Sequence, residues 1–455
     1  MAYINPQIFR EYDIRGIVDK DLNQDVLERI GKAYGTYIKD FGAKVVSIGR
    51  DCRLSSPDYS RAMTRGINST GVDVIDIGMV STPMLYFSLY NLDVGGGVMI
   101  TASHNPGEYN GIKLCRGKDS VFGEQIQRIR EIAEAGEFAS GKGSSSERDI
   151  EDLYVGFLKN NIDMKPGLRA VVDYGNGMVG SIGPRVFREF GCDLKELYVT
   201  PDGTFPNHHP DPTVEENLAQ LIETVRSGKF ELGIGFDGDG DRIGVVDEKG
   251  NIVWGDMLVL VFARDVISRN PGAKIIGDVK CSNRLFDGIT DAGGEAIMWK
   301  TGHSLIKDKM KVEKASLAGE MSGHIFFADK FFGYDDALYA SLRILEIISR
   351  TGKSLSQLLD GIPPAISTPE IRVDCPEAVK FRAVEMVKER LGRSYRIIDI
   401  DGARIEFPDG WGLIRASNTQ PALVLRFEAQ TEDRLLEIRA LIEGELGAVM
   451  AELSK

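Results

Sequence analysis

Three aspartates stand at alternate positions in the segment FDGDGDR. Asp237, Asp239 and Asp241 follow the apolar run ELGIGF, and single glycines separate them. Glycine permits a tight loop, so the three carboxylates can turn toward one point. Oxygen ligands grouped in this way suit a hard cation, and Mg²⁺ is favoured because its remaining positions can hold water and a phosphate oxygen. The segment predicts a Mg²⁺ site, and the neighbouring Arg242 suits a phosphate.

An EF-hand calcium loop is one alternative, because Glu248 falls at position twelve counted from Asp237. Position six, however, is Arg242 instead of the glycine that the sharp turn needs, and the preceding run is typical of a strand. A solvated acidic turn is the other alternative, but three carboxylates this close repel each other without a cation. The pattern therefore favours the Mg²⁺ site over both.

A serine in the segment VGGGVMITASHNPGEYNGIKL is a candidate for carrying a transferred group. Ser103 follows an apolar strand, and ligands commonly bind at this end of strands in open α/β sheets. A serine in such a polar loop can equally be a turn or capping residue. The GxSxG motif of hydrolases is absent, because Thr101 and Asn105 replace its glycines. Acyl transfer is disfavoured, and spacing alone does not make His104 a general base.

Basic side chains near glycines form a third group of candidates. Taken singly, each of them is compatible with an ordinary surface charge; they are Arg15, Lys113, Lys280, His303 and His324. The segment RASNTQP is more specific, because it concentrates hydrogen-bond donors in one loop that could hold a phosphate dianion. Its donors are Arg415, Ser417, Asn418 and Thr419. Neither GxxxxGK[ST] nor GxGxxG after a strand occurs, so nucleotide-driven transfer and dinucleotide redox chemistry lose support.

The elements that must position these residues repeat three times along the chain. In each copy an apolar strand ends at an aspartate, a helix follows, and a glycine precedes a second strand. The aspartates are Asp51, Asp173 and Asp278, and the glycines are Gly71, Gly191 and Gly294. Each interval is long enough for a crossover helix between parallel strands. The sequence predicts three related α/β units of the βαβ type.

Changes in composition divide the chain into four domains. Small and polar residues over 136–149 predict a flexible connector, a strand gives way to an apolar helix over 251–257, and three prolines mark 361–370. Beyond the last link the repeat is absent, and strands with two helices predict a smaller α+β unit. The predicted domains are 1–149, 150–252, 253–364 and 365–455.

Composition narrows the classes of partner. The 455 residues are 42% apolar and 27% charged, which is a globular balance. A net charge of −13 is a poor match for nucleic acid or an anionic membrane, so we expect neither as a partner. Five scattered cysteines without a CxxC pair indicate no disulfide framework and no thiolate zinc site. Since the start lacks a secretory signature and the apolar run Met257–Ala263 is too short to span a bilayer, we expect a cytoplasmic protein.

A metal, an acceptor hydroxyl and separate basic loops together favour phosphoryl transfer. The motifs TASHNP, DGDGDR, GEMSGH and RASNTQP, in this order over nearly the whole chain, resemble those of the α-D-phosphohexomutase superfamily. Within it, the chain most resembles the bacterial phosphomannomutase/phosphoglucomutase family. The resemblance implies four domains around a central cleft, three of them related α/β units and the last a smaller, mobile α+β domain.

The resemblance also implies roles for individual residues. The phosphoryl carrier would be Ser103, and the Mg²⁺ ligands would be Ser103, Asp237, Asp239 and Asp241. General acid/base catalysis and charge stabilisation would fall to Arg15, Lys113 and His324, without a separation between the three. The cleft would be lined by Tyr12, Arg242, Lys280 and His303, sugar hydroxyls would be bound by Glu320 and Ser322 with His324, and the unreacting phosphate would be held by Arg415, Ser417, Asn418 and Thr419.

The reaction implied is the interconversion of hexose 1-phosphate and hexose 6-phosphate, with glucose and mannose phosphates as substrates. Phosphoserine donates to the sugar, the 1,6-bisphosphate turns end for end, and the serine takes the other phosphate back; glucose 1,6-bisphosphate would act as intermediate and activator. A phosphoglucosamine mutase is the first alternative, although its family members usually carry Gln where Met321 stands. A metal-dependent phosphatase and a catalytically silent sugar-phosphate binder are the others.

Overall fold

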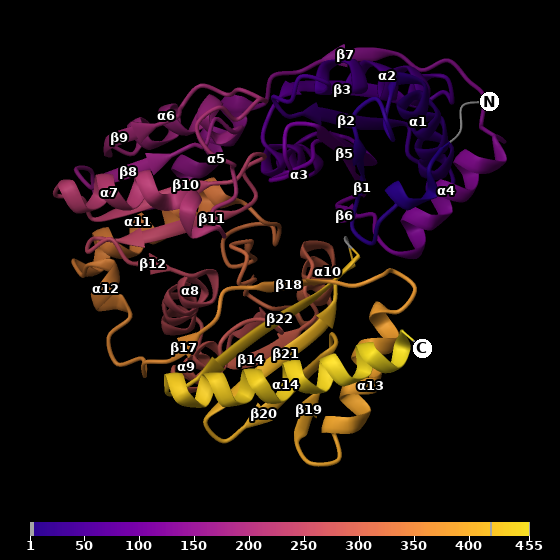
Figure 1. The fold of residues 1–455 in the computed structure, drawn as a ribbon. Coiled ribbons are helices and arrows are strands. Elements are labelled where there is room, and N and C mark those ends of the chain that lie inside the picture. Colours follow the sequence, from indigo (N-terminus) through magenta and orange to yellow (C-terminus); the bar gives the residue numbers. More distant parts are fainter. Residues whose placement is uncertain (1–3, 419–420, 455) are drawn as a thin grey trace.

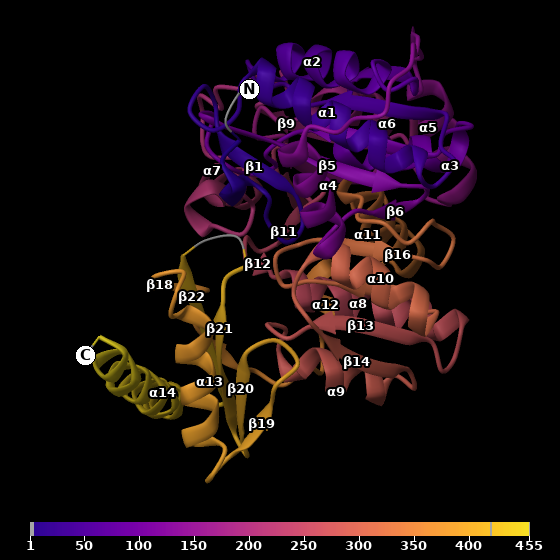
Figure 2. The same ribbon diagram turned by 90° about the vertical axis from the view of Figure 1, so that its right-hand side faces the viewer.

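The computed structural model describes residues 4–418 and 421–454, which form four sheets that follow one another along the chain. We call each sheet with its helices a unit. In Figure 1 the first and second units lie side by side at the top, and the third and fourth lie below them. Figure 2 shows helix α14 (Glu432–Leu453) on the outer side of the fourth unit, away from the other three.

The first unit has a seven-stranded mixed sheet in the order β1-β5-β4-β2-β3-β7, with β6 paired to β5. Its strands are β1 (Ile14–Ile17), β2 (Val45–Arg50), β3 (Asp73–Met79), β4 (Gly96–Ile100), β5 (Tyr109–Arg116), β6 (Asp119–Ser120) and β7 (Ser145–Glu147). Its helices are η1 (Pro6–Ile8), α1 (Gln24–Lys39), α2 (Ser56–Asn68), α3 (Thr82–Asn91) and α4 (Glu124–Ala135). The side chain of Asn23 caps the start of α1, and Gly42 follows its end with a φ of 79°.

The second unit has a five-stranded sheet in the order β12-β11-β10-β8-β9. Its strands are β8 (Arg169–Asp173), β9 (Asp193–Leu197), β10 (Leu232–Phe236), β11 (Ile243–Asp247) and β12 (Ile252–Val253), and its helices are α5 (Glu151–Asn161), α6 (Val179–Glu189), η2 (Glu215–Leu218) and α7 (Ala219–Ser227). Helix α7 packs closely on β10, because a Cβ at Gly233 would lie 2.8 Å from Val225.

The third unit has a four-stranded sheet in the order β14-β13-β15-β16. Its strands are β13 (Lys274–Asp278), β14 (Glu295–Trp299), β15 (Leu317–Gly319) and β16 (Ile325–Phe327), and its helices are α8 (Gly255–Arg269), α9 (Asn283–Asp291), α10 (His303–Glu313), α11 (Ala337–Thr351) and α12 (Leu355–Leu358). The apolar run Met257–Ala263 lies in α8 and is buried throughout, so it is a core helix.

The predicted threefold repeat is confirmed, and it extends further than the sequence showed. In each unit the two strands of the sequence repeat pair in parallel: β2 with β3, β8 with β9, and β13 with β14. A third parallel strand lies on the other side of the first (β4, β10 and β15), and an antiparallel strand follows it (β5, β11 and β16). Three sheets therefore share one four-stranded pattern.

The fourth unit is the expected smaller α+β unit. Its sheet has the order β17-β22-β21-β20-β19, with β18 also paired to β22. The strands are β17 (Ile366–Ser367), β18 (Ile371–Asp374), β19 (Arg396–Ile398), β20 (Ala403–Phe407), β21 (Gly410–Ala416) and β22 (Ala422–Ala429), and the helices are α13 (Lys380–Leu391) and α14. All strand pairs among the described residues of this sheet are antiparallel, so the βαβ pattern of the other units is absent there.

Apolar packing joins the first three units more tightly than it joins the fourth. One continuous core contains Phe87 of the first unit, Val172 of the second and Leu260 of the third. The fourth unit has its own core between its sheet and its two helices. Only a small cluster, Val279 with Trp411 and Leu413, packs across the boundary between the third and fourth units among the described clusters.

The segment 136–149 is not the free connector that its composition predicted. Its residues Ser145–Glu147 form β7, which pairs in parallel with β3 at the edge of the first sheet. The glycines that suggested flexibility instead permit close packing, because a Cβ at Gly143 would lie 2.2 Å from the carbonyl oxygen of Val72. None of the helices in the described part of the chain combines the length and apolar character that crossing a bilayer requires.

Candidate active site

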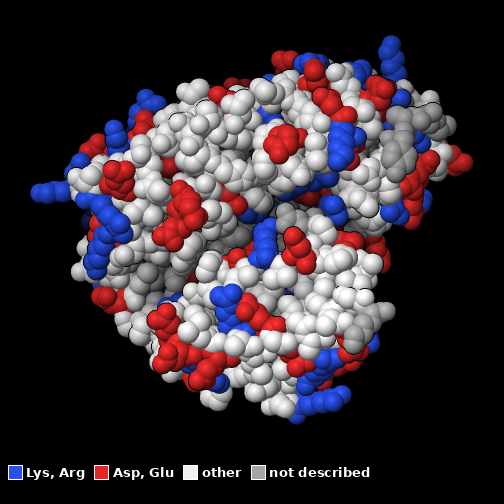
Figure 3. Space-filling view, in the orientation of Figure 1, with Lys and Arg blue, Asp and Glu red and all other residues white. Residues whose placement is uncertain are grey.

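Three of the four sequence motifs lie in equivalent loops of the repeated sheets. Ser103 lies between β4 and β5, the three aspartates lie between β10 and β11, and the segment 320–324 lies between β15 and β16. Each loop leaves the carboxyl end of a parallel strand, where α/β sheets commonly bind ligands. Figure 3 shows a hollow at the centre of the molecule, with lysine and arginine side chains along its edges.

The Ser103 hydroxyl lies directly against the aspartate loop. Ser103 Oγ donates a hydrogen bond of 2.9 Å to Asp237 Oδ2, although the two residues belong to different units. The serine is buried, and its φ of 52° lies in the left-handed region that a non-glycine residue rarely adopts. The fold therefore holds this hydroxyl in a strained conformation at the position where it meets the carboxylates.

The aspartate loop has the convergent geometry that its glycines predicted. Gly240, with a φ of 80°, allows a tight turn in which Asp237 Oδ1 accepts hydrogen bonds from the backbone N–H groups of Gly240 and Asp241, at 2.9 and 3.0 Å. One carboxylate oxygen from each of the three aspartates lies within 4.8 Å of the others. Antiparallel strands flank this loop, so an EF-hand is excluded.

Lys113 and Thr82 approach the same carboxylates from the first unit. Lys113 Nζ donates a hydrogen bond of 3.0 Å to Asp239 Oδ2 and also contacts Asp241, and Thr82 Oγ1 donates one of 2.6 Å to Asp239 Oδ2. Burial opposes the charge on Lys113, but the two carboxylates outweigh it and raise its pKa. Burial and the charges of Asp241 and Asp239 raise the pKa of Asp237 well above its ordinary value.

The aspartate group fits a divalent cation. Among the described residues, Asp239 Oδ1 is buried without a hydrogen-bond partner, so this carboxylate retains one oxygen for a ligand. Asp241 Oδ1 also lacks a hydrogen-bond partner, and it faces His324 Nε2 at 3.3 Å. These two oxygens, with Asp237 and the Ser103 hydroxyl beside it, supply the hard donors that Mg²⁺ prefers.

The loop of the third unit adds a charged histidine to this centre. His324 Nε2 lies 3.3 Å from Asp241 Oδ1, and His324 Nδ1 lies 2.8 Å from Glu320 Oε2. Burial and Arg242 oppose protonation, but these two carboxylates raise the pKa of His324 to about 9. Ser322 Oγ lies 3.2 Å from His324 Nδ1, and Arg242 Nε lies 3.2 Å from His324 Nε2.

Two further predicted residues reach the centre through the loops that carry the motifs. Arg15 donates a hydrogen bond of 2.5 Å to Asn105 Oδ1, two residues from Ser103. The ring of His303 lies 5.7 Å from the ring of His324, between centroids. Burial and the charge of Lys307 hold the pKa of His303 well below its ordinary value, so this ring is neutral.

The phosphate-loop candidates lie on the fourth unit and reach the others through Tyr12. The Tyr12 hydroxyl donates a hydrogen bond of 2.9 Å to the carbonyl oxygen of Thr301 and accepts one of 2.8 Å from Asn418 Nδ2. Arg415 Nε donates to Asp401 Oδ2 at 2.9 Å, and the Thr301 N–H donates to the same oxygen. Ser417 follows in the same loop and is buried; Thr419 lies outside the described residues.

Lys280 lies at the boundary between the third and fourth units. Its Nζ donates a hydrogen bond of 3.1 Å to Glu370 Oε2 and lies 3.9 Å from Asp278 Oδ2. Within the described chain, neither Lys280 nor Arg415 makes a hydrogen bond or ion pair with Ser103. The predicted residues therefore fall into a reactive end, comprising Ser103, Lys113, Asp237, Asp239, Asp241 and His324, and a clamp end, comprising Arg415, Ser417 and Asn418.

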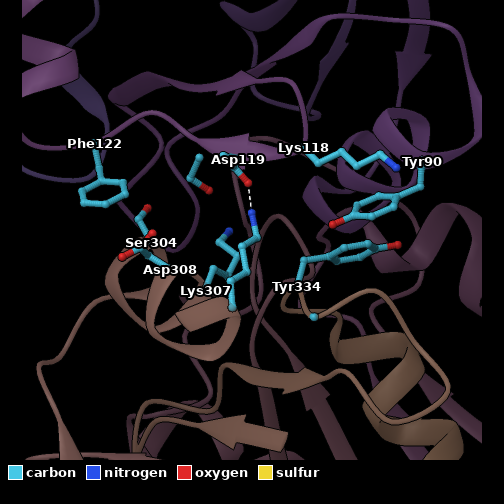
Figure 4. Close-up of a pocket in the computed structure, with 11 residues that line it drawn as sticks. Tyr90, Lys118, Asp119, Phe122, Ser304, Lys307, Asp308 and Tyr334 are labelled. Atoms are coloured by element: carbon cyan, nitrogen blue, oxygen red, sulfur yellow. Dashed lines mark ion pairs between the residues drawn. The ribbon is translucent and has the colours of Figure 1, made fainter. Parts of the chain in front are cut away.

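A pocket also opens along the boundary between the first and third units (Figure 4). Lys118 and Tyr90 line it on one side, and Lys307 and Tyr334 line it on the other, while an ion pair between Lys311 and Asp119 crosses it. None of the predicted site residues within the described chain lines this pocket. It therefore marks where the units meet beside the site and lies outside the site itself.

Sequence reasoning missed three side chains that touch this constellation. Thr82 follows β3 at the same edge of the first sheet as Ser103, so the rule that found Ser103 could have found Thr82. Asp335 and Lys307 form a buried pair with a distance of 3.1 Å between Oδ1 and Nζ. Asp335 also lies within reach of Asp241 and His324, but no motif or spacing pointed to it.

Comparisons with known protein families agree with this division into units. Four models of the phosphoglucomutase/phosphomannomutase family match the chain in order: alpha/beta/alpha domain I at residues 6–140, domain II at 152–250, domain III at 254–365 and the C-terminal domain at 370–444. The fold thus belongs to the α-D-phosphohexomutase class, as the motifs predicted.

Individual relatives are similar over almost their whole length. The chain is 46% identical to a phosphomannomutase/phosphoglucomutase of Pseudomonas aeruginosa, covering 98% of this chain and 96% of the relative, and 46% identical to a phosphoglucomutase of Neisseria gonorrhoeae, covering 96% of each. A crystal structure of a phosphoglucomutase/phosphomannomutase family protein from Burkholderia thailandensis has a TM-score of 0.93 and 41% identity, covering 98% of each chain. The chain belongs to the phosphoglucomutase/phosphomannomutase family.

Proposed function

We propose that this protein is a phosphohexomutase that interconverts the 1-phosphates and 6-phosphates of glucose and mannose through a phosphoserine at position 103. The observation that carries the proposal is the 2.9 Å hydrogen bond between the Ser103 hydroxyl and Asp237 in a buried group of three carboxylates. A hydroxyl in this position can take and return a phosphoryl group beside a cation. The relatives named for glucose and mannose phosphates favour the same substrates.

The reactive end supplies the groups that each transfer needs. A sugar hydroxyl oxygen attacks the phosphorus of phosphoserine, the bond between phosphorus and Ser103 Oγ breaks, and the hydroxyl proton passes to a neighbouring base. Arg15, Lys113 and His324 are the residues that we assign to proton transfer and to stabilisation of charge on the phosphoryl oxygens. Lys113 and His324 already contact the carboxylate group, so their positions are fixed before substrate binds.

We assign Mg²⁺ to Asp237, Asp239, Asp241 and the Ser103 oxygen. When bound, this cation neutralises charge on the phosphoryl oxygens. Thr82 and Lys113 hold Asp239 in place through hydrogen bonds to one of its oxygens, which leaves the other oxygen for the metal. We propose glucose 1,6-bisphosphate as both the reaction intermediate and the activator that phosphorylates Ser103.

Separate reactive and clamp ends allow both phosphates of the substrate to be held at once. Arg415, with Ser417, Asn418 and Thr419, would bind the phosphate that is not reacting, because a guanidinium and hydroxyl groups match a phosphate dianion. Tyr12, Arg242, Lys280 and His303 would line the path between the two ends, and Glu320 and Ser322 would bind sugar hydroxyls. After the first transfer, the bisphosphate must turn end for end so that the two phosphates exchange positions.

We propose that the four domains, 1–149, 150–252, 253–364 and 365–455, each contribute one loop to this site. The overall acidity of the chain argues against nucleic acid as a partner, so the basic loops serve a small phosphosugar. All five cysteines are free thiols, which is consistent with a cytoplasmic location.

The substrate assignment is tested by measuring turnover of glucose 1-phosphate, mannose 1-phosphate and glucosamine 1-phosphate side by side. We expect kcat/KM for the glucose and mannose compounds to exceed that for the amino sugar. A clear preference for glucosamine 1-phosphate would replace this assignment with a phosphoglucosamine mutase. Release of inorganic phosphate without isomerised sugar phosphate would indicate a phosphatase and would contradict the mutase.

A further inference from the structure

Arg53 is a fully buried arginine in the turn between β2 and α2, and its side chain points into the loop that carries Ser103. Its exposed fraction is 0%, and all five of its N–H donors make hydrogen bonds. Nε donates to Asp51 Oδ2 at 3.2 Å. The four remaining donors bind backbone carbonyl oxygens of the serine loop: those of Ser103 at 2.8 Å, Asn105 at 2.5 Å, Pro106 at 2.7 Å and Tyr109 at 2.9 Å.

These four carbonyls belong to the stretch of backbone that determines where the Ser103 hydroxyl lies. Ser103 has a positive φ, which is unfavourable for a residue with a Cβ and persists only where the surroundings impose it. The loop is irregular, so most of its carbonyls lack the ladder partners that a strand would give them. One planar guanidinium therefore provides hydrogen-bond donors for four backbone carbonyl groups and fixes their orientation.

Arg53 is itself held in place from two sides. Asp51 Oδ1 accepts hydrogen bonds from the Arg53 backbone N–H at 3.0 Å and from Ser56 Oγ at 2.5 Å. From the second unit, the ring of Phe205 lies 5.3 Å from Arg53 Cζ, and a Cβ at Gly203 would lie 2.5 Å from Arg53 Cα. The guanidinium thus lies where the first unit meets the unit that carries the metal loop.

The threefold repeat places Arg53 and Lys280 at equivalent positions. Each lies two residues after the aspartate of its copy of the sequence repeat, which is Asp51 after β2 in one case and Asp278 at the end of β13 in the other. Lys280 extends across a boundary to Glu370 of the fourth unit, whereas Arg53 turns back into the loop of its own unit. At this position of the repeat, the third unit therefore has a side chain that contacts the fourth unit, whereas the first unit has a side chain that holds its own serine loop.

We propose that Arg53 is a positioning residue for phosphoryl transfer, which holds the serine loop so that the Ser103 hydroxyl faces the metal-binding carboxylates. This inference rests on the proposed mutase function. Arg53 does not touch the reacting atoms through its side chain, so it acts through the backbone of Ser103. Its removal should slow the transfer step while leaving the clamp end and the three carboxylate ligands of the metal in place.

The test compares Arg53→Lys with the wild-type protein. Lysine keeps the charge but has one nitrogen and cannot bind four carbonyls in a fixed plane. We expect kcat to fall on the order of 10²-fold, as for a misplaced reacting group, with KM changed less than about threefold. Mg²⁺ affinity, measured by calorimetry, should fall less than about threefold, because the three carboxylate ligands stay in place. Arg61→Lys, on the exposed face of α2, is the matched control and should retain wild-type kcat.

A folded Arg53→Lys variant with kcat within threefold of wild type would overturn the inference. A fall in Mg²⁺ affinity as large as the fall in kcat would also overturn it, because it would show that the three carboxylates had moved as well and would indicate a general structural role. If Arg53→Lys does not fold, the Asp51→Asn variant provides the test, because it removes the charge that orients Arg53. We expect its kcat to fall about tenfold. An unchanged kcat would refute the proposal. If the proposed mutase function is itself wrong, the wild-type protein will show no mutase activity, and this result is distinguishable from an effect of the Arg53 substitution.

Discussion

The reactive end and the clamp end of the site lie on different kinds of sheet with different cores. The loops of the reactive end leave equivalent strands of three related sheets, and a continuous apolar core runs through those three units. The clamp end lies on an antiparallel sheet with a core of its own. At the reactive end Ser103 and Lys113 bind the carboxylates of another unit directly, whereas at the clamp end Asn418 reaches the first unit through the Tyr12 hydroxyl.

This difference suits a reaction in which the bisphosphate intermediate must rotate end for end between two phosphoryl transfers. Phosphoryl transfer needs reacting atoms held within a fraction of an ångström, and the shared core of three units provides that rigidity. Reorientation needs one phosphate to be released and bound again, which a separately folded unit can allow. We therefore expect changes at the reactive end to lower kcat and changes at the clamp end to raise KM.

The largest effect is expected from Ser103→Ala, which removes the hydroxyl that carries the phosphoryl group. Mutase activity should fall on the order of 10³-fold or more, because the substitution removes the phosphoryl carrier and the Thr82 hydroxyl at the same carboxylates already donates its hydrogen bond to Asp239. The thermal unfolding midpoint should change little, since only the hydrogen bonds of one hydroxyl to Asp237 and His104 are lost. Ser120→Ala, in β6 of the same unit, serves as the control. Near wild-type activity in Ser103→Ala would remove the reactive end from the mechanism.

A smaller loss is expected from Asp239→Asn. The amide cannot provide the negative charge that balances the cation, and it also weakens the contact with Lys113, so Mg²⁺ affinity should fall at least about tenfold. Titration calorimetry with Mg²⁺ measures this directly, with the exposed Asp193→Asn as the matched variant. Unchanged Mg²⁺ affinity would contradict the metal assignment.

Arg415→Lys tests the clamp end. A lysine replaces the planar fork of the guanidinium with a point charge, so we expect KM for glucose 1-phosphate to rise about tenfold while kcat stays within about threefold. Steady-state kinetics separates the two constants, and Arg439→Lys on the outer helix α14 should leave both unchanged. A fall in kcat with an unaltered KM would contradict the assignment of substrate binding to the clamp end and of phosphoryl transfer to the reactive end.

The smallest effect is expected from Tyr12→Phe, which cuts the hydrogen-bonded link between the ends. Loss of the hydroxyl breaks its bonds to Thr301 and Asn418, each worth about 0.5–1.5 kcal/mol. KM should therefore rise a few-fold, with the fold unchanged by circular dichroism. Tyr395→Phe in the fourth unit provides the comparison, and an effect larger than that of Arg415→Lys would reverse the order proposed here.

The sequence predicted the repeated parts of this molecule well. Asp51, Asp173 and Asp278 marked the first strands because a buried parallel strand, a crossover helix and a second strand leave a strong periodic pattern. Glycines at alternate positions likewise predicted the convergent aspartate loop. The same reasoning misjudged 136–149, because composition does not distinguish glycines that permit flexibility from glycines that permit close packing.

Contacts between distant segments were beyond sequence reasoning. Arg53 lies 50 residues before Ser103, and only the folded sheet brings its guanidinium to the serine loop. Asp335 reaches Asp241 and His324 from a segment without any motif. Strands β20 and β21 were not predicted individually, because whether such residues form strands depends on the neighbours with which they pair. Motifs identify the groups that do chemistry, whereas the residues that orient them are set by tertiary structure.

The central claim is that one side-chain oxygen carries phosphorus between protein and sugar, and intact-mass spectrometry tests it most directly. The wild-type protein should gain the mass of one phosphoryl group on incubation with glucose 1,6-bisphosphate and Mg²⁺, and should lose it again on addition of hexose phosphate. Peptide mapping should place that group on Ser103, and the Ser103→Ala variant should gain no mass. Phosphorylation of another residue, or turnover without any phosphorylated form of the wild-type protein, would contradict the account.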